Sequence, residues 1–447
     1  MPQLAKPYAG QAAVPAAQRR LFLVFFAPDT FAIIYLLELL YRCMRVEPQK
    51  WYVTREPIDH RNWHLAGLSK TKRKDKTYVR NNILSAAFSG PRSFQLSDRE
   101  YSRSVELAYP GVKAACDVTF DEMWTLFLDS GFLYPEKVSR LQPVMREIQN
   151  TVRSLLKANG NPMATVVVRN EQALDAQISM LRWYDKTWMV QHLAALPLSA
   201  RERHASARVT LAMARYGRVR PDIHWGKMFF RPNNAWPSRV FGGFAKRVRD
   251  PQKSDLRVFH YLVAVTGDSS PEVPSQVRVR PAAESDFALI ENWFTSRGRT
   301  VEVMANDLQP SRASLAHLSW GYCRVGLDRH RECIIAERDG RTTGFALLEV
   351  SSLGMNFSEL TNAFTVFTLE DDPETRLALV LSAKQRYGEL GRGQCIALEE
   401  GDDLSSFEAA GFVKVKDYAC WTFHRDLFGE LEEYFIRLFE TRRKRAA

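Results

Sequence analysis

The feature that most constrains this fold is a polar segment, residues 267–275, which lies between two stretches of similar pattern. The segment reads Gly-Asp-Ser-Ser-Pro-Glu-Val-Pro-Ser and is flanked by alternating, strand-like sequence. Pro, Gly and Ser in such a run are typical of a linker. The chain has 447 residues, about three times the ~150 of a typical domain. We therefore expect two or three domains in total, with this segment as a boundary between them.

The copy after the linker has the clearer pattern. Residues 276–280 alternate as an opening strand, and two apolar strands at 332–338 and 341–351 are joined by Asp339-Gly340, a pair typical of two-residue hairpin turns. The rest of the pattern predicts further strands and helices in an α/β order: strands at 364–369, 394–399 and 414–424, and helices at 286–294, 373–390, 404–410 and 427–442.

This order resembles the GCN5-related N-acetyltransferase (GNAT) superfamily over about residues 276–428. The resemblance is carried by residues 334–350, Ile-Ile-Ala-Glu-Arg-Asp-Gly-Arg-Thr-Thr-Gly-Phe-Ala-Leu-Leu-Glu-Val, and by residues 404–412, Leu-Ser-Ser-Phe-Glu-Ala-Ala-Gly-Phe, before a final strand. It implies an α/β fold with mixed sheets, an acyl-CoA donor and transfer of the acyl group to an amine.

The half before the linker shows the same order more weakly. Thr119 and Glu122 form a capping-box pattern that starts a helix, and residues 234–244 take the place of 404–412. The remaining expected elements are helices at 144–157 and 200–216 and strands at 164–169, 176–184, 187–193, 223–230 and 256–265. We therefore predict two GNAT-like domains in tandem, at 98–266 and 276–447, with an N-terminal extension at 1–97 and a C-terminal helix.

Charge is unequal between the two halves. The net charge of +11 divides into 40 Lys and Arg against 24 Asp and Glu in residues 1–275, and 22 against 27 afterwards. The basic half suits a phosphate-bearing partner, so contact with RNA is one possible use of it. Six scattered cysteines without a Cys-x-x-Cys pair favour a reducing, cytoplasmic location over a disulfide scaffold.

One segment, residues 21–41, is apolar enough to raise the question of a membrane span. Pro28-Asp29-Thr30 and Glu38 interrupt it, and a carboxylate inside hydrocarbon costs about 2.5–3.5 kcal/mol. We expect a strand followed by a capped helix rather than an integral span, with contact at a membrane surface as the alternative. No small-residue cleavage site of a signal peptide follows it.

The resemblance implies where a donor would bind. GNAT enzymes commonly hold the pyrophosphate of coenzyme A on a Gly-rich turn at the start of the central helix. The second copy has Glu370-Asp-Asp-Pro-Glu there, which repels an anion. The first copy has no glycines but offers hydrogen-bonding and cationic groups, so we expect acetyl-CoA or another acyl-CoA at Ser199, Arg201, Arg203 and Arg208; simple solvation of these arginines is the alternative.

Three residues are candidates for proton transfer. Glu349 ends a central strand of the second copy, where GNAT enzymes often place a general base, and Tyr418 on the last strand could supply the acid. His192 takes the corresponding place in the first copy. Each has a structural alternative: Glu349 as a solvated carboxylate at a strand end, Tyr418 as an aromatic residue of the core or its rim, and His192 as a buried core histidine. His60 and His64 lack a third ligand, so no metal is expected.

These observations favour an acyltransferase that moves an acyl group from acyl-CoA to a small-molecule or peptide amine. Two alternatives stay open. One is a transferase that takes its acyl group from aminoacyl-tRNA. The other is a non-catalytic nucleotide-binding or regulatory protein on degenerate GNAT folds, because one phosphate seat is acidic and the other lacks glycine.

Overall fold

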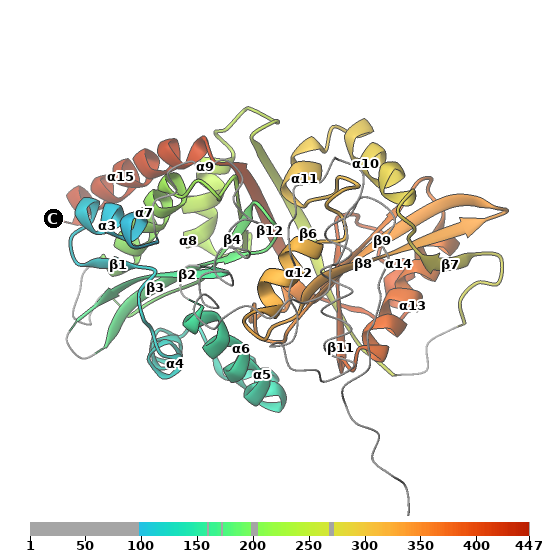
Figure 1. The fold of residues 1–447 in the computed structure, drawn as a ribbon, viewed down its shortest axis with the longest axis horizontal. Coiled ribbons are helices and arrows are strands. Elements are labelled where there is room, and N and C mark those ends of the chain that lie inside the picture. Colours follow the sequence, from blue (N-terminus) through green and yellow to red (C-terminus); the bar gives the residue numbers. More distant parts are fainter. Residues whose placement is uncertain (1–97, 159–160, 171–172, 198–203, 268–271, 447) are drawn as a thin grey trace, which may run out of the picture. The chain divides into compact units, whose positions relative to one another are not determined.

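The computed structural model describes residues 98–446, apart from 159–160, 171–172, 198–203 and 268–271 (Figure 1). The predicted N-terminal extension, with its expected strand and helix in residues 21–44, lies outside the described residues. Among the described residues, no helix combines the length and the apolar composition that crossing a membrane requires.

The first half builds an antiparallel sheet that ends in a parallel pair. Strands β1 to β4 pair antiparallel in chain order, and β4 then pairs parallel with β5. Thr119 caps the second described helix as its sequence predicts, accepting a 3.2 Å hydrogen bond from the Glu122 amide. The elements are α3 (Asp98–Ala108), β1 (Val112–Ala114), α4 (Phe120–Asp129), α5 (Pro135–Leu141), α6 (Met145–Lys157), β2 (Met163–Arg169), β3 (Leu174–Arg182), β4 (Thr187–Ala195), α7 (Ala205–Val219), β5 (Trp225–Phe230), the short turns α8 (Ala235–Pro237), η3 (Ser238–Gly242) and α9 (Gly243–Ala245), and β6 (Ser254–Val265).

The second half repeats this order. Four antiparallel strands lead to a parallel pair, which is β10 with β11. The elements are β7 (Arg278–Pro281), α10 (Asp286–Ser296), α11 (Thr300–Ala305), α12 (Ala316–Cys323), β8 (Arg329–Arg338), β9 (Arg341–Ser351), β10 (Ala363–Thr368), α13 (Pro373–Glu389), β11 (Gln394–Glu399), α14 (Ser405–Ala409), β12 (Val413–His424) and the C-terminal helix α15 (Leu427–Ala446). The predicted α/β fold, with two units of the same strand order in tandem, is confirmed by this repeat.

The closing strands of the two halves are exchanged. The strands of the described residues form one sheet in the order β1-β2-β3-β4-β5-β12-β6-β11-β10-β9-β8-β7. The last strand of the second half therefore pairs with β5 of the first, while β6 pairs with β11 of the second. Figure 1 shows β6 and β12 side by side at the centre. The division of the chain at 267–275 remains a prediction, since the exchange carries pairing across it.

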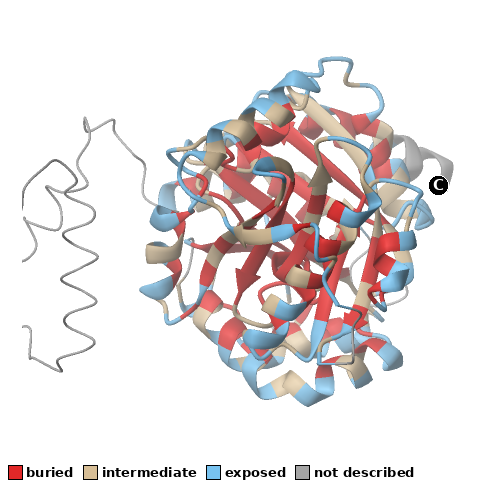
Figure 2. Ribbon diagram, turned by 90° about the vertical axis from the view of Figure 1, so that its right-hand side faces the viewer, coloured by how far each residue is buried: buried red, intermediate tan, exposed pale blue. Residues whose placement is uncertain are grey.

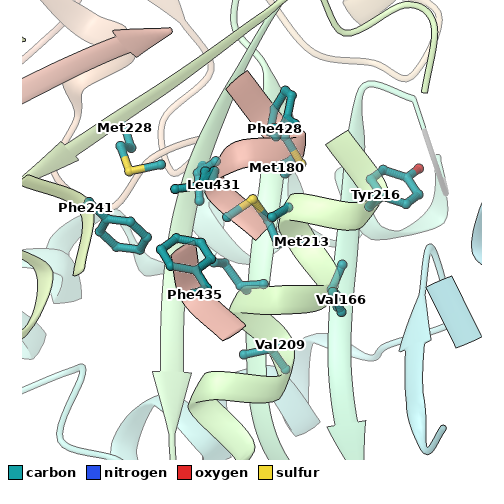
Figure 3. Close-up of a cluster of buried hydrophobic side chains, with 14 of the residues drawn as sticks. Val166, Met180, Val209, Met213, Tyr216, Met228, Phe241, Phe428, Leu431 and Phe435 are labelled. Carbon is teal, nitrogen blue, oxygen red and sulfur yellow. The ribbon is translucent and has the colours of Figure 1, made fainter. Parts of the chain in front are cut away.

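Helices cover the sheet on both faces and bury its apolar side chains (Figure 2). In the first half, α7 and the C-terminal helix α15 pack on each other and on the strands, and Figure 3 shows Met213, Phe428 and Leu431 meeting there. In the second half, α13 and α14 bury Phe364 and Phe407. Residues 352–360, which connect β9 to β10, pack against the first half through Met355 and Phe357.

Candidate functional site

The two parallel strands of the first half separate at an irregularity in β4. The pairing of β4 with β5 runs from Thr187 opposite Trp225 to Val190 opposite Met228. Just beyond it, His192 and Leu193 lie opposite the single residue Ile178 of β3. His192 has a φ of 56°, so its backbone is in the left-handed region. Such a bulge turns backbone groups away from the ladder and makes them available to a ligand.

The His192 side chain is packed among aromatic rings. Its ring centroid lies 4.5 Å from that of Phe357, 5.7 Å from Phe127 and 6.0 Å from Phe132. Burial, with a contribution from the charge on Lys137, lowers the pKa of His192 to about 3. The imidazole is therefore neutral at physiological pH and a weak base, and its Nε2 has no hydrogen-bond partner among the described residues.

Four cations lie around this opening, and we call Lys137, Arg140, Arg231 and Lys416 the basic cluster. The Lys137 side chain is only 8% exposed, and its Nζ lies 4.2 Å from the ring centroid of Phe132. Burial and the charges on Lys416 and Arg140 lower the pKa of Lys137 to about 7. Burial and the charges on Arg140 and Arg231 lower that of Lys416 to about 8. Within the described ranges, none of the four forms an ion pair.

The exchanged strand β12 brings Tyr418 to the same place. The Tyr418 hydroxyl lies 3.0 Å from the Ser358 hydroxyl, and Tyr261 of β6 donates a 2.9 Å hydrogen bond to the Ser358 carbonyl. Lys416 lies above both rings, its Nζ 4.6 Å from the centroid of Tyr261 and 5.1 Å from that of Tyr418. Burial raises the pKa of Tyr418 and keeps its phenol protonated.

Residues 352–360 of the second half close one side of this opening. Gln191 of β4 donates a 3.0 Å hydrogen bond to the Met355 carbonyl and accepts one of 2.8 Å from the Asn356 side chain. The site is therefore built from both halves of the chain, and the structure brings two predicted residues, His192 and Tyr418, to its edges.

Glu349 lies elsewhere, in a buried ion pair. Its carboxylate is 2.7 Å from the Arg329 guanidinium and 2.9 Å from that of Arg331. Burial raises the pKa of Glu349, but the charges on Arg331 and Arg329 outweigh burial and lower it to about 2. A carboxylate held in this way is a very weak base, so its environment favours a structural role over the expected role as general base.

A side chain of the protein caps the start of α13, the place where the resemblance would put a phosphate in the second half. Asp372 caps α13, accepting hydrogen bonds of 3.1 and 3.3 Å from the amides of Glu374 and Thr375. Its second oxygen accepts a 2.6 Å bond from the Thr375 hydroxyl. These two amides at the start of α13 are thus satisfied by a carboxylate; that this acidic turn does not bind an anion stays a prediction.

Of the four residues expected to hold the donor, only Arg208 lies within the described part of the chain. Ser199, Arg201 and Arg203 fall in the segment that is not described. Arg208 is in the first turn of α7 and donates a hydrogen bond to the Pro110 carbonyl. This contact braces the turn between α3 and β1, so at least one function of Arg208 is structural.

Sequence reasoning missed two adjoining cavities near the point where β10 and β11 separate. One, of about 80 Å³, is lined by both halves, with Tyr184 and Lys227 on one side and Glu349 on the other. The second, of about 170 Å³, is lined mainly by the second half. Trp293 and Phe367 form apolar walls. The charged side chains around them pair with one another, as Arg299 does with Glu302 and Glu400 at 2.5 Å each. No local pattern could have identified this network, because its members come from separate elements.

Comparison with known proteins finds similar solved structures at low sequence identity. No protein-family model matches the chain, and no curated protein matches it. Among solved structures, a tandem GNAT protein from the clavulanic acid biosynthesis pathway is 14% identical over 62% of this chain and 88% of its own, with a TM-score of 0.35. A GCN5-related N-acetyltransferase from Sphaerobacter thermophilus is 11% identical over 71% and 96%, with a TM-score of 0.40. These values carry no argument for an activity.

Within the described residues, no group of three or more His, Cys, Asp or Glu side chains is arranged to hold a metal ion. Free thiols are present at Cys116, Cys323, Cys333, Cys395 and Cys420.

Proposed function

We propose that this chain is an acyltransferase that moves an acyl group from acetyl-CoA or another acyl-CoA to a small-molecule or peptide amine. The observation that carries the proposal is the opening between β4 and β5, where a bulge at His192 lies beside the basic cluster. Diverging parallel strands offer unpaired backbone groups to an extended donor, and unpaired cations attract an anionic one.

The chemistry requires stabilisation of an oxyanion and protonation of a thiolate. The amine attacks the thioester carbonyl, the C–N bond forms, and the tetrahedral intermediate collapses with loss of the thiolate. Backbone amides at the bulge are suited to the developing oxyanion. The Tyr418 hydroxyl, kept protonated by burial, is suited to give its proton to the leaving thiolate. The phenolate that results then takes up the proton that the attacking nitrogen loses, which restores the hydroxyl and leaves a neutral amide. His192 has a pKa too low for an efficient base, so we propose that it shapes the pocket wall and that the amine arrives in its neutral form.

The first half is also the better place for the phosphates of the donor. The Asp372 cap satisfies two amides at the start of α13 in the second half. We therefore propose Ser199, Arg201 and Arg203, which precede α7 in the sequence, together with Arg208 of α7 as the seat of the phosphates. The net positive charge of residues 1–275 supports this choice.

Two other functions are tested by the same experiments. The paired state of Glu349 and the capped α13 are features that a non-catalytic nucleotide-binding or regulatory protein would also have. The basic first half would equally suit contact with RNA in an aminoacyl-tRNA-dependent transferase. The free thiols support the proposal of a cytoplasmic location.

Calorimetric titration of the full chain with acetyl-CoA tests the proposal. We expect micromolar binding, which the double substitution Arg201→Glu/Arg203→Glu weakens by at least tenfold, or about 1.4 kcal/mol. Arg146→Glu/Arg249→Glu, at two exposed arginines that form no ion pair with the described residues, is the matched control and should bind as the unchanged chain does. Absence of acyl-CoA binding, with retention of another nucleotide detected by mass spectrometry, would support the non-catalytic alternative. Binding of aminoacyl-tRNA alone would support the third.

A further inference from the structure

The buried ammonium of Lys137 has no counter-ion in the described structure. Lys137 lies on α5 with 8% of its side chain exposed, and its Nζ faces the rings of Phe132, at 4.2 Å, and Phe357, at 6.0 Å. Proteins rarely bury a charged group unless it is paired, because the lost hydration is not recovered by contacts with rings alone. Such a group either loses its proton or gains a counter-ion, and an anion from outside the described chain would supply the counter-ion.

The surroundings of Lys137 strengthen this conclusion, because the charged side chains that act on it are cationic. Arg140 and Lys416 are close enough to act on its charge, and Arg231 acts in turn on Lys416. The carboxylate near Tyr261 is that of Glu359, and both of its oxygens are occupied: one accepts from the Gly354 amide at 3.0 Å and the other from the Asn362 side chain at 2.6 Å. A ligand that carries negative charge would complete the cluster.

The position of the cluster indicates which part of a ligand it meets. Lys137 acts on His192, the bulge residue at which the strands separate, so the cluster lies at the reacting end of the opening. In coenzyme A the pantetheine arm separates the thioester from the pyrophosphate, and the phosphates of a donor therefore lie away from this end. The two lysines of the cluster that contact aromatic rings, Lys137 and Lys416, are point charges without the planar fork of arginine. Arg140 and Arg231 act on them by charge, and neither has a ring contact with the described residues.

We propose that Lys137 and Lys416 bind a carboxylate carried by one of the two reactants, next to the bonds that form and break. The carboxylate belongs either to the acceptor amine or to the acyl group of the donor. Assigning it to a reactant rests on the proposed function, whereas the anion site itself does not. The rings of Phe132 and Phe357 lie beside Lys137, and the ring of Tyr418 lies beside Lys416.

Succinate is the probe for the site, and succinamide, its neutral analogue, is the control ligand. With the full chain in calorimetry, succinate should bind saturably and succinamide should not. Lys137→Met keeps the length of the side chain and removes its charge, and it should weaken succinate binding by at least tenfold, as should Lys416→Met. Lys246→Met, at an exposed lysine of the first half, should leave it unchanged. Equal binding of succinate by all four proteins, or binding of succinamide as tight as that of succinate, would overturn the proposal.

A second titration distinguishes the source of the carboxylate and separates this inference from the proposed function. Tighter binding of succinyl-CoA than of acetyl-CoA, lost in Lys137→Met, assigns the carboxylate to the acyl group. Equal binding of the two thioesters, with succinate still bound, assigns it to the acceptor. If neither thioester binds while succinate does, the acyltransferase proposal fails and the anion site stands.

Discussion

The hydroxyl of Tyr184 donates a 3.0 Å hydrogen bond to the buried carboxylate of Glu349, which lies 165 residues further along the chain. Tyr184 is in the turn between β3 and β4 of the first half, and Glu349 is on β9 of the second. The same carboxylate pairs with Arg329 and Arg331, and Arg329 also donates to the Trp183 carbonyl. Glu349 is thus the centre of a polar contact that holds the two halves together.

The main effect of Glu349→Gln should therefore be a loss of folding stability rather than a direct effect on catalysis. The substitution leaves Arg329 and Arg331 buried without a full counter-charge, and breaking a buried ion pair from one side costs about 3–5 kcal/mol. We expect the free energy of unfolding to fall by that amount in urea denaturation. Glu389→Gln is the control, because Glu389 is 49% exposed and pairs with Arg386 at the surface; it should cost less than about 1 kcal/mol. Equal losses would contradict the structural role.

The exchange of the closing strands can be tested at Gly226, where β5 and β12 lie side by side. This residue of β5 pairs with Phe423 of β12, and a Cβ built on it would lie 2.2 Å from the Phe423 ring. Gly226→Ala should lower the free energy of unfolding by about 1–3 kcal/mol through overpacking, measured by urea denaturation. Adding Phe423→Leu should recover part of the loss. Gly393→Ala, with open space around its position, should change stability by less than about 0.5 kcal/mol. A harmless Gly226→Ala would argue that β12 does not lie beside β5.

Local order was predictable from the sequence because it depends on short patterns. The strands at 341–351 and 394–399 have the predicted ends, and the box at Thr119 caps its helix. The exchange was not predictable, because β6 and β12 are both twelve-residue strands and nothing local decides which of them pairs with β5.

The site was less predictable than the fold for a related reason. His192 and Tyr418 were found by their place in the fold, but Lys137 lies in a short helix whose sequence, Pro-Glu-Lys-Val-Ser-Arg-Leu, is typical of an exposed surface. It is buried by Phe357, more than two hundred residues away. The sequence did contain a signal for the pairing of Glu349. Arg329 and Arg331 are two residues apart and therefore lie on the same face of β8, the strand that precedes β9.

Asp372→Ala tests the proposal that the second half does not bind the phosphates of the donor. Loss of the cap should lower the free energy of unfolding by about 0.5–2 kcal/mol, measured by thermal or urea denaturation. The affinity for acetyl-CoA should not change, because the proposed donor seat is at the start of α7. A clear gain in affinity on removing this carboxylate would move the seat to α13 and contradict the assignment to the first half. Asp371→Ala, at an exposed neighbour that does not cap the helix, is the matched control for the change in charge.

The lowered pKa of Lys137 predicts how stability depends on pH. An unfolded lysine keeps its proton up to about pH 10.4, whereas burial and the charges on Lys416 and Arg140 bring the pKa of Lys137 to about 7 in the folded chain. Between these values the unfolded state binds more protons, so the contribution of Lys137 to stability rises with pH; below about pH 7 both states are charged, and the folded state bears the full cost of the buried ammonium.

Lys137→Met removes this contribution, so the difference in unfolding free energy between the unchanged chain and the variant should rise with pH from about 7 to 10. Each unit of pKa corresponds to about 1.4 kcal/mol. The buried thiols of Cys333, Cys395 and Cys420, whose pKa values burial raises, oppose the trend at high pH but act in both proteins and cancel in the difference. Urea denaturation at a series of pH values measures this difference in unfolding free energy, with Lys246→Met as control.

Succinate gives a second measurement. If succinate pairs with Lys137 as proposed, saturating succinate should raise the pKa of Lys137 and flatten the plot of unfolding free energy against pH for the unchanged chain below about pH 9. A plot that succinate leaves unaltered would place the anion elsewhere.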